Sequence, residues 1–170
     1  DNGVLKDSLL EFQDNSIMQK LDNKNNNFYT GGIDVHGGWN WKILNNTFRN
    51  IEREGKSMEH AIHFWSKSRG TLVAGNRIIN CYRGVGFGMK REGTKKIRIY
   101  PDGAGTDPYF DHIGGTIVNN LIYSEKGVHL ETGIELMNVQ NVQVYHNTVV
   151  SHERPFSSIE YRWPNTRVDI

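Results

Sequence analysis

The sequence predicts an all-β solenoid of about five stacked rungs, and three observations favour this fold class. Two short segments with apolar residues at alternate positions recur together along the 170-residue chain. An asparagine occupies one position of the second segment in each complete copy. One copy carries a long insertion, whereas the other copies have nearly equal lengths. Such repeats are typical of stacked architectures, in which neighbouring copies bury a continuous core.

The first recurring segment alternates apolar and polar residues with a period of two, as a strand with one buried face does. Its copies lie at 32–35, 61–64, 84–87, 133–136 and 158–161. We expect the two apolar residues of each copy, from Ile33 and Val35 to Ile159 and Tyr161, to point into the core. The residue between them then points outward.

The second segment has the pattern apolar-x-x-Asn-x-apolar and lies at 43–48, 73–78, 117–122 and 144–149. These segments are too short and too rich in β-branched residues for helices, so we expect each copy to form strand, turn, strand, asparagine turn and strand. Stacking places the asparagines in one column at a corner of the coil. Asparagine suits that corner because it tolerates a left-handed backbone and its amide can bond the backbone of its own and the next rung.

The turns NNTF, GNRI, NNLI and HNTV resemble the asparagine ladder of right-handed parallel β-helix proteins of the pectate-lyase-like superfamily. The resemblance covers about residues 32–170. It implies a right-handed parallel β-helix whose first sheet carries a carbohydrate groove on its outer face and flanking loops. It also implies a polysaccharide or oligosaccharide partner and a secreted, periplasmic or cell-surface location.

The repeats fit a single domain over residues 1–170, in which residues 1–30 form an irregular cap or an incomplete first rung. The chain stops before the fifth copy reaches its asparagine turn. An uncapped solenoid exposes apolar residues and unpaired strand edges, so we expect a segment of a longer β-helix or self-association through an end.

Composition excludes several function classes. The 20 basic and 19 acidic residues give no polyanion signal, so no nucleic-acid partner is expected. No apolar run reaches the roughly 18 residues of a membrane span. The single cysteine, Cys81, excludes an intramolecular disulfide and a cysteine-based zinc site.

Two outward columns on the first strands carry the candidate chemistry. The first consists of Asp34, His63, Gly86, Glu135 and Glu160, and the second of His36, Trp65, Gly88, Met137 and Arg162. Neighbouring rungs lie about 4.8 Å apart, so we expect Asp34 beside His63 and Glu135 beside Glu160. The glycines would leave an open floor at the centre, on which a ligand could rest.

Three interpretations of these columns stay open. A carboxylate such as Asp34 raises the pKa of a neighbouring imidazole, which would make His63 or His36 a general acid or base. Repulsion between Glu135 and Glu160 would keep one of them protonated, as glycoside hydrolysis requires. The third interpretation is an ordinary ladder of polar pairs on a solvated sheet face.

The insertion at 89–115 is about 21 or 22 residues longer than its counterparts, and solenoids often place such loops on the binding face. Its first half is basic and its second half is acidic. Lys90 and Tyr109, with Trp65 and Arg162 from the columns, are the candidate substrate contacts, since basic side chains pair uronate carboxylates.

Metal binding has one candidate set. The acidic half of the insertion contains Asp102, Asp107 and Asp111, which are candidates for calcium although the loop lacks the full EF-hand pattern. No HExxH, histidine-rich or cysteine motif supports zinc, and the remaining histidines are assigned to turns or the surface: His60, His129, His146 and His152.

These features predict a carbohydrate-active protein that acts on a polysaccharide, expected to be acidic, by lyase or glycoside hydrolase chemistry. The alternative is a non-catalytic glycan-binding, surface or adhesion module. The stacked aspartates of polygalacturonases and the calcium-binding acids of pectate lyases cannot be aligned onto this chain.

Overall fold

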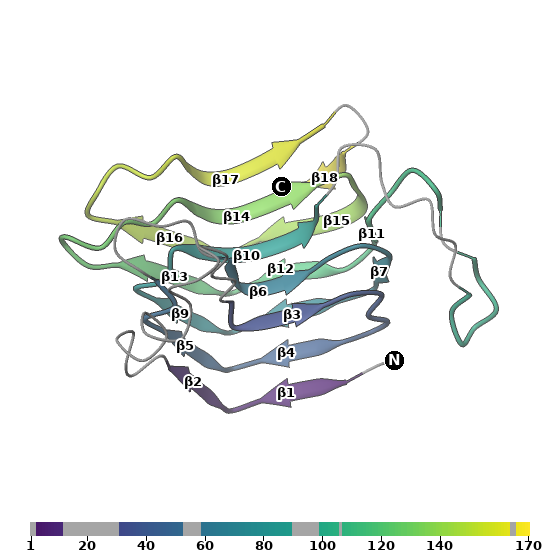
Figure 1. The fold of residues 1–170 in the computed structure, drawn as a ribbon, viewed down its shortest axis with the longest axis horizontal. Coiled ribbons are helices and arrows are strands. Elements are labelled where there is room, and N and C mark those ends of the chain that lie inside the picture. Colours follow the sequence, from purple (N-terminus) through teal and green to yellow (C-terminus); the bar gives the residue numbers. More distant parts are fainter. Residues whose placement is uncertain (1–2, 12–30, 53–58, 90–98, 106, 164–165) are drawn as a thin grey trace, which may run out of the picture.

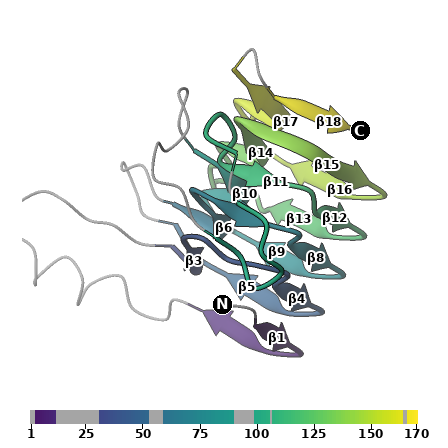
Figure 2. The same cartoon turned by 90° about the vertical axis from the view of Figure 1, so that its right-hand side faces the viewer.

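The computed structural model describes residues 3–11, 31–52, 59–89, 99–105, 107–163 and 166–170. These residues form strands and turns, and three parallel sheets wind round one core (Figure 1). The successive rungs lie above one another from β1 at one end to β17 at the other (Figure 2). The described part of the chain has no helix with the length and apolar character that crossing a bilayer requires.

Sheet 1 contains the five predicted copies of the first segment. Its strands stand in the spatial order β17-β14-β10-β6-β3, and every pair is parallel. The bounds are β3 (Ile33–Val35), β6 (His60–Phe64), β10 (Arg83–Gly88), β14 (Thr132–Met137) and β17 (Ser157–Arg162).

Sheets 2 and 3 contain the remaining strands. Sheet 2 consists of β1 (Val4–Lys6), β4 (Lys42–Leu44), β7 (Ser68–Arg69), β8 (Leu72–Ala74), β11 (His112–Ile113), β12 (Thr116–Val118), β15 (Val139–Tyr145) and β18 (Arg167–Asp169). Sheet 3 consists of β2 (Leu9–Glu11), β5 (Thr47–Arg49), β9 (Arg77–Ile79), β13 (Leu121–Ser124) and β16 (Thr148–Ser151). Strands β1 and β2 add a partial rung below β4 and β5; the rest of the cap or rung predicted for 1–30 lies largely outside the described residues.

The core follows the predicted alternation. Ile62, Phe64, Val85, Phe87 and their partners on β14 are fully buried. The prediction was wrong for Tyr161, which is 65% exposed. This residue lies on β17, the edge strand of sheet 1, where no further described strand covers it.

The asparagine ladder is confirmed at the corner between sheets 2 and 3. The first three ladder side chains donate through Nδ2 to Oδ1 of the asparagine on the next rung, at 3.1 Å from Asn46 to Asn76, 3.0 Å from Asn76 to Asn120 and 2.9 Å from Asn120 to Asn147. The same Oδ1 atoms accept the backbone N–H of the preceding asparagine. Each buried polar corner is therefore hydrogen-bonded along the stack, as burial of amide groups requires.

The left-handed backbone at this corner belongs to a different residue from the one predicted. Positive φ angles occur one residue before each ladder asparagine, at Asn45 (56°), Gly75 (68°), Asn119 (55°) and His146 (55°). The sharp bend at that residue turns the next side chain into the stack. The residue before each ladder asparagine therefore makes the left-handed bend, and the asparagine itself makes the hydrogen bonds, whereas the pattern assigned both to the asparagine.

Candidate functional site

The site lies on the outer face of sheet 1, where the predicted columns are in register. Asp34 pairs with His63, His63 with Gly86, Gly86 with Glu135, and Glu135 with Glu160. In the next column, Gly88 pairs with Met137, which pairs with Arg162. The predicted positions are therefore confirmed as neighbours on the sheet.

This face is buried, and the interpretation as an ordinary solvated ladder was wrong for its centre. His63 and Glu135 are 1% and 2% exposed. A cavity of about 230 Å³ lies over them. Its described lining comes from β6, β10, β14, β17 and adjoining turns: Glu59, His60, His63, Trp65, Arg83, Met89, Glu135, Met137, Arg162 and Trp163.

His60 belongs to this site, and its assignment to a turn was wrong. It is the first residue of β6, and the ladder pairs His60 with Arg83 and then Ile62 with Val85, with no pair between Ala61 and Gly84. This skipped pair brings His60 to the same outer face as His63, although two residues three apart on a regular strand would face opposite sides.

A column of small residues marks the irregularity. A Cβ added to Gly84 would lie 2.2 Å from the carbonyl oxygen of Gly133, and one added to Gly32 would lie 2.3 Å from that of Ala61. Larger side chains are excluded where successive rungs approach so closely. Gly or Ala immediately precedes the first core residue in four of the five strands of sheet 1, whereas the edge strand β17 has Ser158 there. This recurrence was the sequence signal for the irregularity that follows His60.

The two imidazoles have carboxylate and carbonyl partners. His60 Nε2 lies 2.9 Å from Glu135 Oε2, and His63 Nε2 lies 2.9 Å from the carbonyl oxygen of Gly88. Glu59 approaches both rings, because its Oε2 lies 3.4 Å from His60 Nδ1 and 3.2 Å from His63 Nδ1. Sequence reasoning missed Glu59, which lies just before β6.

The aromatic rings form a continuous row along the face. The ring centroids are 4.4 Å apart for His60 and His63, 4.2 Å for His63 and Trp65, and 5.1 Å for Trp65 and His36. Trp65 is buried, whereas the side chain of His36 is 55% exposed. The row therefore leads from the buried imidazoles to the surface.

Two arginines border the imidazoles. Arg83 Nε donates to Glu131 Oε2 at 2.6 Å. Arg162 donates to both carboxylate oxygens of Glu160, and its Nε lies 3.6 Å from Glu135 Oε1. Arg162 therefore bridges the two glutamates that were predicted to repel each other.

Burial and neighbouring groups shift the pKa values of His60 and His63 in opposite directions. Burial lowers the pKa of His60, but hydrogen bonds with Glu135 and Glu59 outweigh this effect and raise it overall. Burial lowers the pKa of His63, and the charge of His60 lowers it further. The cluster thus favours a charged His60 beside a neutral His63.

Glu135 is held as a carboxylate. Burial raises the pKa of Glu135, but the hydrogen bond from His60 and the charges of His60, Arg83 and Arg162 outweigh this and lower it. Glu135 is therefore not the stored acid that its position beside Glu160 suggested. Burial also raises the pKa of Glu59, but the hydrogen bonds with His60 and His63 lower it well below its usual range.

Comparison with known proteins decides the family. A family model described as a right-handed β-helix region matches residues 9–163, which is most of the chain. The chain belongs to the right-handed β-helix family. That description names a fold and no reaction. Neither the curated proteins nor the solved structures contain a match to the chain.

Within this β-helix, the predicted residue Asp34 lies at the rim of the site. Its Oδ1 is 3.7 Å from His36 Nε2, and Asp34 is exposed. The carboxylate that His63 Nδ1 approaches is that of Glu59, 3.2 Å away. The acid–base pair predicted between Asp34 and His63 is therefore replaced, at the centre of the site, by Glu59 and His63.

Lys67, which is 3% exposed, anchors the described part of the insertion to the β-helix by hydrogen bonds. Its Nζ donates to the carbonyl oxygens of Asp107 and Phe110, at 2.6 and 2.8 Å. Tyr109 is 65% exposed and does not line the cavity over sheet 1. Lys90 and the basic half of the insertion lie outside the described residues.

The calcium candidates lie in different surroundings. Asp102 accepts hydrogen bonds from Arg69 and the Ala104 amide, Asp107 accepts one from the Tyr109 amide, and Asp111 is fully buried. Within the described residues, the group of three possible metal-ligating side chains with donor atoms less than 4.8 Å apart is Glu59, His60 and His63. Calcium binding by the three aspartates stays a prediction.

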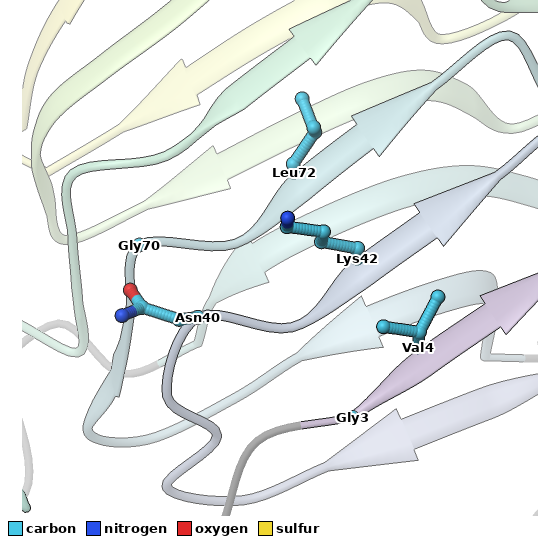
Figure 3. A pocket seen from close by; sticks show the side chains of 6 residues that line it. All are labelled: Gly3, Val4, Asn40, Lys42, Gly70 and Leu72. Carbon is cyan, nitrogen blue, oxygen red and sulfur yellow. The ribbon is translucent and has the colours of Figure 1, made fainter.

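Another hollow, of about 500 Å³, lies on the outer face of sheet 2 (Figure 3). Its described lining comes from β1, β4, β8 and nearby turns: Gly3, Val4, Asn40, Lys42, Gly70 and Leu72. Lys42 is the one titratable side chain in that described lining. The described lining of this hollow therefore contains no acid–base pair like the one in the cavity over sheet 1.

Proposed function

We propose that this β-helix protein acts on an acidic polysaccharide by acid–base chemistry at the cavity over sheet 1. The observation that carries the proposal is the pair of adjacent imidazoles with opposite proton preferences. His60, bonded to Glu135, favours the charged form, and His63 favours the neutral form. Neighbouring groups whose environments separate their pKa values in this way are typical of a general acid and a general base.

A lyase reaction fits these roles. Neutral His63 would abstract the proton from the ring carbon that bears the carboxylate of a uronate sugar. Charged His60 would donate a proton to the glycosidic oxygen as the bond between that oxygen and the uronate ring breaks. The electron pair of the broken C–H bond forms the new double bond. Arg162, 34% exposed at the cavity edge, would pair the uronate carboxylate.

Hydrolysis is the second reaction within this proposal, because the same cavity contains the carboxylates Glu59 and Glu135. The narrower resemblance to the pectate-lyase-like superfamily supports a polysaccharide substrate. A location outside the cytoplasm, where such substrates occur, is part of the proposal.

The alternative is a module that binds glycans without turnover, with a surface or adhesion role. Burial favours this alternative, since His60 and His63 are each 1% exposed. The partly exposed ring of His36, stacked on Trp65, would then offer a platform for a sugar ring.

A screen of the wild-type protein against uronic and neutral polysaccharides, with and without calcium, tests the proposal. Ultraviolet absorbance of unsaturated ends identifies a lyase, and new reducing ends without that absorbance identify a hydrolase. We expect His63→Gln to lower turnover by about 100-fold or more, as loss of a general base does. His152→Gln is the matched control, because His152 is exposed and contacts Tyr123 on sheet 3.

Two results separate the hypotheses. Equal turnover by His63→Gln and the wild type would contradict the assigned base. Glycan binding without products across the panel would support the binding module instead.

We also propose self-association through the two ends of the stack. Phe156, Tyr161 and Ile170 at one end are 65–67% exposed, and Val4 and Leu9 at the other are 60–64% exposed. Unpaired strand edges beside such residues favour pairing between chains. Light scattering that gives only the monomer mass over a wide concentration range would contradict this.

A further inference from the structure

Three donor atoms converge at the cavity over sheet 1. Glu59 Oε2 lies 3.2 Å from His63 Nδ1 and 3.4 Å from His60 Nδ1, and donor atoms of all three residues lie within 4.8 Å of one another. The skipped pair at Ala61 makes this possible, because it brings His60 and His63 to one face of β6.

The Nε2 atoms of His60 and His63 already have hydrogen-bond partners. The Gly88 carbonyl can only accept, so His63 Nε2, 2.9 Å away, carries hydrogen. The carboxylate of Glu135 likewise accepts from His60 Nε2 at 2.9 Å. In the neutral rings, the lone pairs are then on the two Nδ1 atoms, which face Glu59.

With neutral rings, this arrangement brings three hydrogen-bond acceptors together, namely the two Nδ1 atoms and the Glu59 carboxylate. The His63 Nδ1 lone pair faces a carboxylate oxygen of Glu59 at 3.2 Å, and in the neutral ring the lone pair of buried His60 Nδ1 faces the same oxygen at 3.4 Å with no hydrogen-bond donor between them. One proton satisfies only one of these nitrogens. Two protons would place two charged rings with centroids 4.4 Å apart in a buried cluster. A cation among the three donor atoms satisfies all of them.

We propose that Glu59, His60 and His63 bind one divalent transition-metal ion of the zinc class. Ligands about 2.0–2.1 Å from a tetrahedral ion lie about 3.3 Å from one another. The distances of 3.2 and 3.4 Å from Glu59 Oε2 match that edge length. The fourth position is left to a ligand from the cavity, as at zinc sites with three protein ligands.

The surroundings support the same assignment. A ligating histidine normally donates its other N–H to a carboxylate or a backbone carbonyl, and Glu135 and Gly88 supply these two partners. Two imidazoles and a carboxylate favour zinc and its neighbours over calcium, which takes six to eight oxygen ligands.

The metal site goes beyond the proposed function and does not depend on it. A metal ion and a proton on His60 Nδ1 compete for the same lone pair. Bound zinc would therefore block the acid–base reaction proposed for His60 and His63, and chelation would restore it.

Calorimetry on chelator-treated protein, without any polysaccharide, tests the site. We expect one Zn²⁺ per chain with micromolar or tighter affinity, and much weaker binding of Ca²⁺. Co²⁺ should give the intense visible absorbance of a tetrahedral complex. Loss of a polysaccharide activity, or failure to find one, would not affect these readouts.

The variants identify the ligands. Glu59→Gln removes a ligand that is 21% exposed, so the fold should persist by circular dichroism while zinc affinity falls by about 100-fold or more. Glu135→Gln keeps all three proposed ligands, alters the partner of His60 and of Arg162, and should lower affinity about 10–100-fold. His152→Asn, which removes an exposed histidine, should bind as the wild type does. Absence of Zn²⁺ and Co²⁺ binding by folded wild type, or unchanged binding by folded Glu59→Gln, overturns the proposal.

Discussion

His60 and Glu135 are 75 residues apart in the sequence, yet His60 Nε2 lies 2.9 Å from Glu135 Oε2. They belong to β6 and β14, which are separated by β10. Strands two rungs apart lie about 9.6 Å from each other, too far for most direct contacts. Gly86 of β10 has no side chain and leaves the space in which His60 reaches over the intervening rung.

The first prediction concerns this glycine. A Cβ at Gly86 would lie 2.7–2.8 Å from three atoms of the His60 ring, so Gly86→Ala should displace the ring and break its bond to Glu135. We expect the free energy of unfolding in urea to fall by about 1–3 kcal/mol. Gly105→Ala is the control, because among the described residues no atom beyond its chain neighbours lies within 4 Å of the position that its methyl group would take, and its φ is not positive. Equal unfolding midpoints for the two variants would contradict the role of Gly86.

The second prediction concerns the buried charge pair. Glu135→Ala leaves His60 buried without its carboxylate, so the free energy of unfolding should fall by about 3–5 kcal/mol. Glu160→Ala should cost about 1 kcal/mol or less, since its partner Arg162 is 34% exposed and water can replace the carboxylate. Chemical denaturation of both variants measures the difference, and a larger loss for Glu160→Ala would refute this ranking.

The third prediction concerns the ladder. Asn76 Oδ1 accepts from both the backbone N–H and Nδ2 of Asn46, and Asn76 is 1% exposed. Asn76→Ala leaves these buried donors unsatisfied and should destabilise the protein by about 2–4 kcal/mol. Asn147→Ala should cost less, because Asn147 is half-buried and water reaches its neighbours. Thermal or urea unfolding that ranks Asn147 above Asn76 would exclude this explanation.

The fourth prediction concerns pH. His112 is fully buried, its Nε2 contacts Thr71 Oγ1 at 3.0 Å, and burial lowers its pKa from 6.5 to about 3. Below pH 6.5 the unfolded chain binds a proton that the folded protein does not, so stability falls as pH drops from 6.5 towards 3. By about pH 5 this loss is about 2 kcal/mol, at about 1.36 kcal/mol per pH unit.

His112→Gln cannot titrate and should show a shallower fall in the free energy of unfolding between about pH 6.5 and pH 5. His129→Gln, which changes an exposed histidine, should keep the wild-type slope. Identical slopes for all three proteins would show that His112 does not control this dependence.

The fold could be predicted because its signals are local and repeated. Each strand of sheet 1 shows its buried face in four residues, and each corner shows its asparagine in six. The site was only partly predictable for the opposite reason. Glu59 and His60 lie outside the alternating pattern, and their position depends on a skipped pair between β6 and β10.

The sequence by itself determined the rungs, the columns and the register that places His63, Gly86 and Glu135 side by side, since the period of two fixes the outward residue of each strand and the recurring strand and asparagine segments align the copies despite the insertion. Only the tertiary structure decided which side chains meet. Burial of the outer face and the reach of His60 across Gly86 depend on how rungs pack in three dimensions, and the approach of Glu59 to both imidazoles depends on the local irregularity of β6. A repeat pattern records which face a residue takes, but it does not record contacts between rungs that are not neighbours.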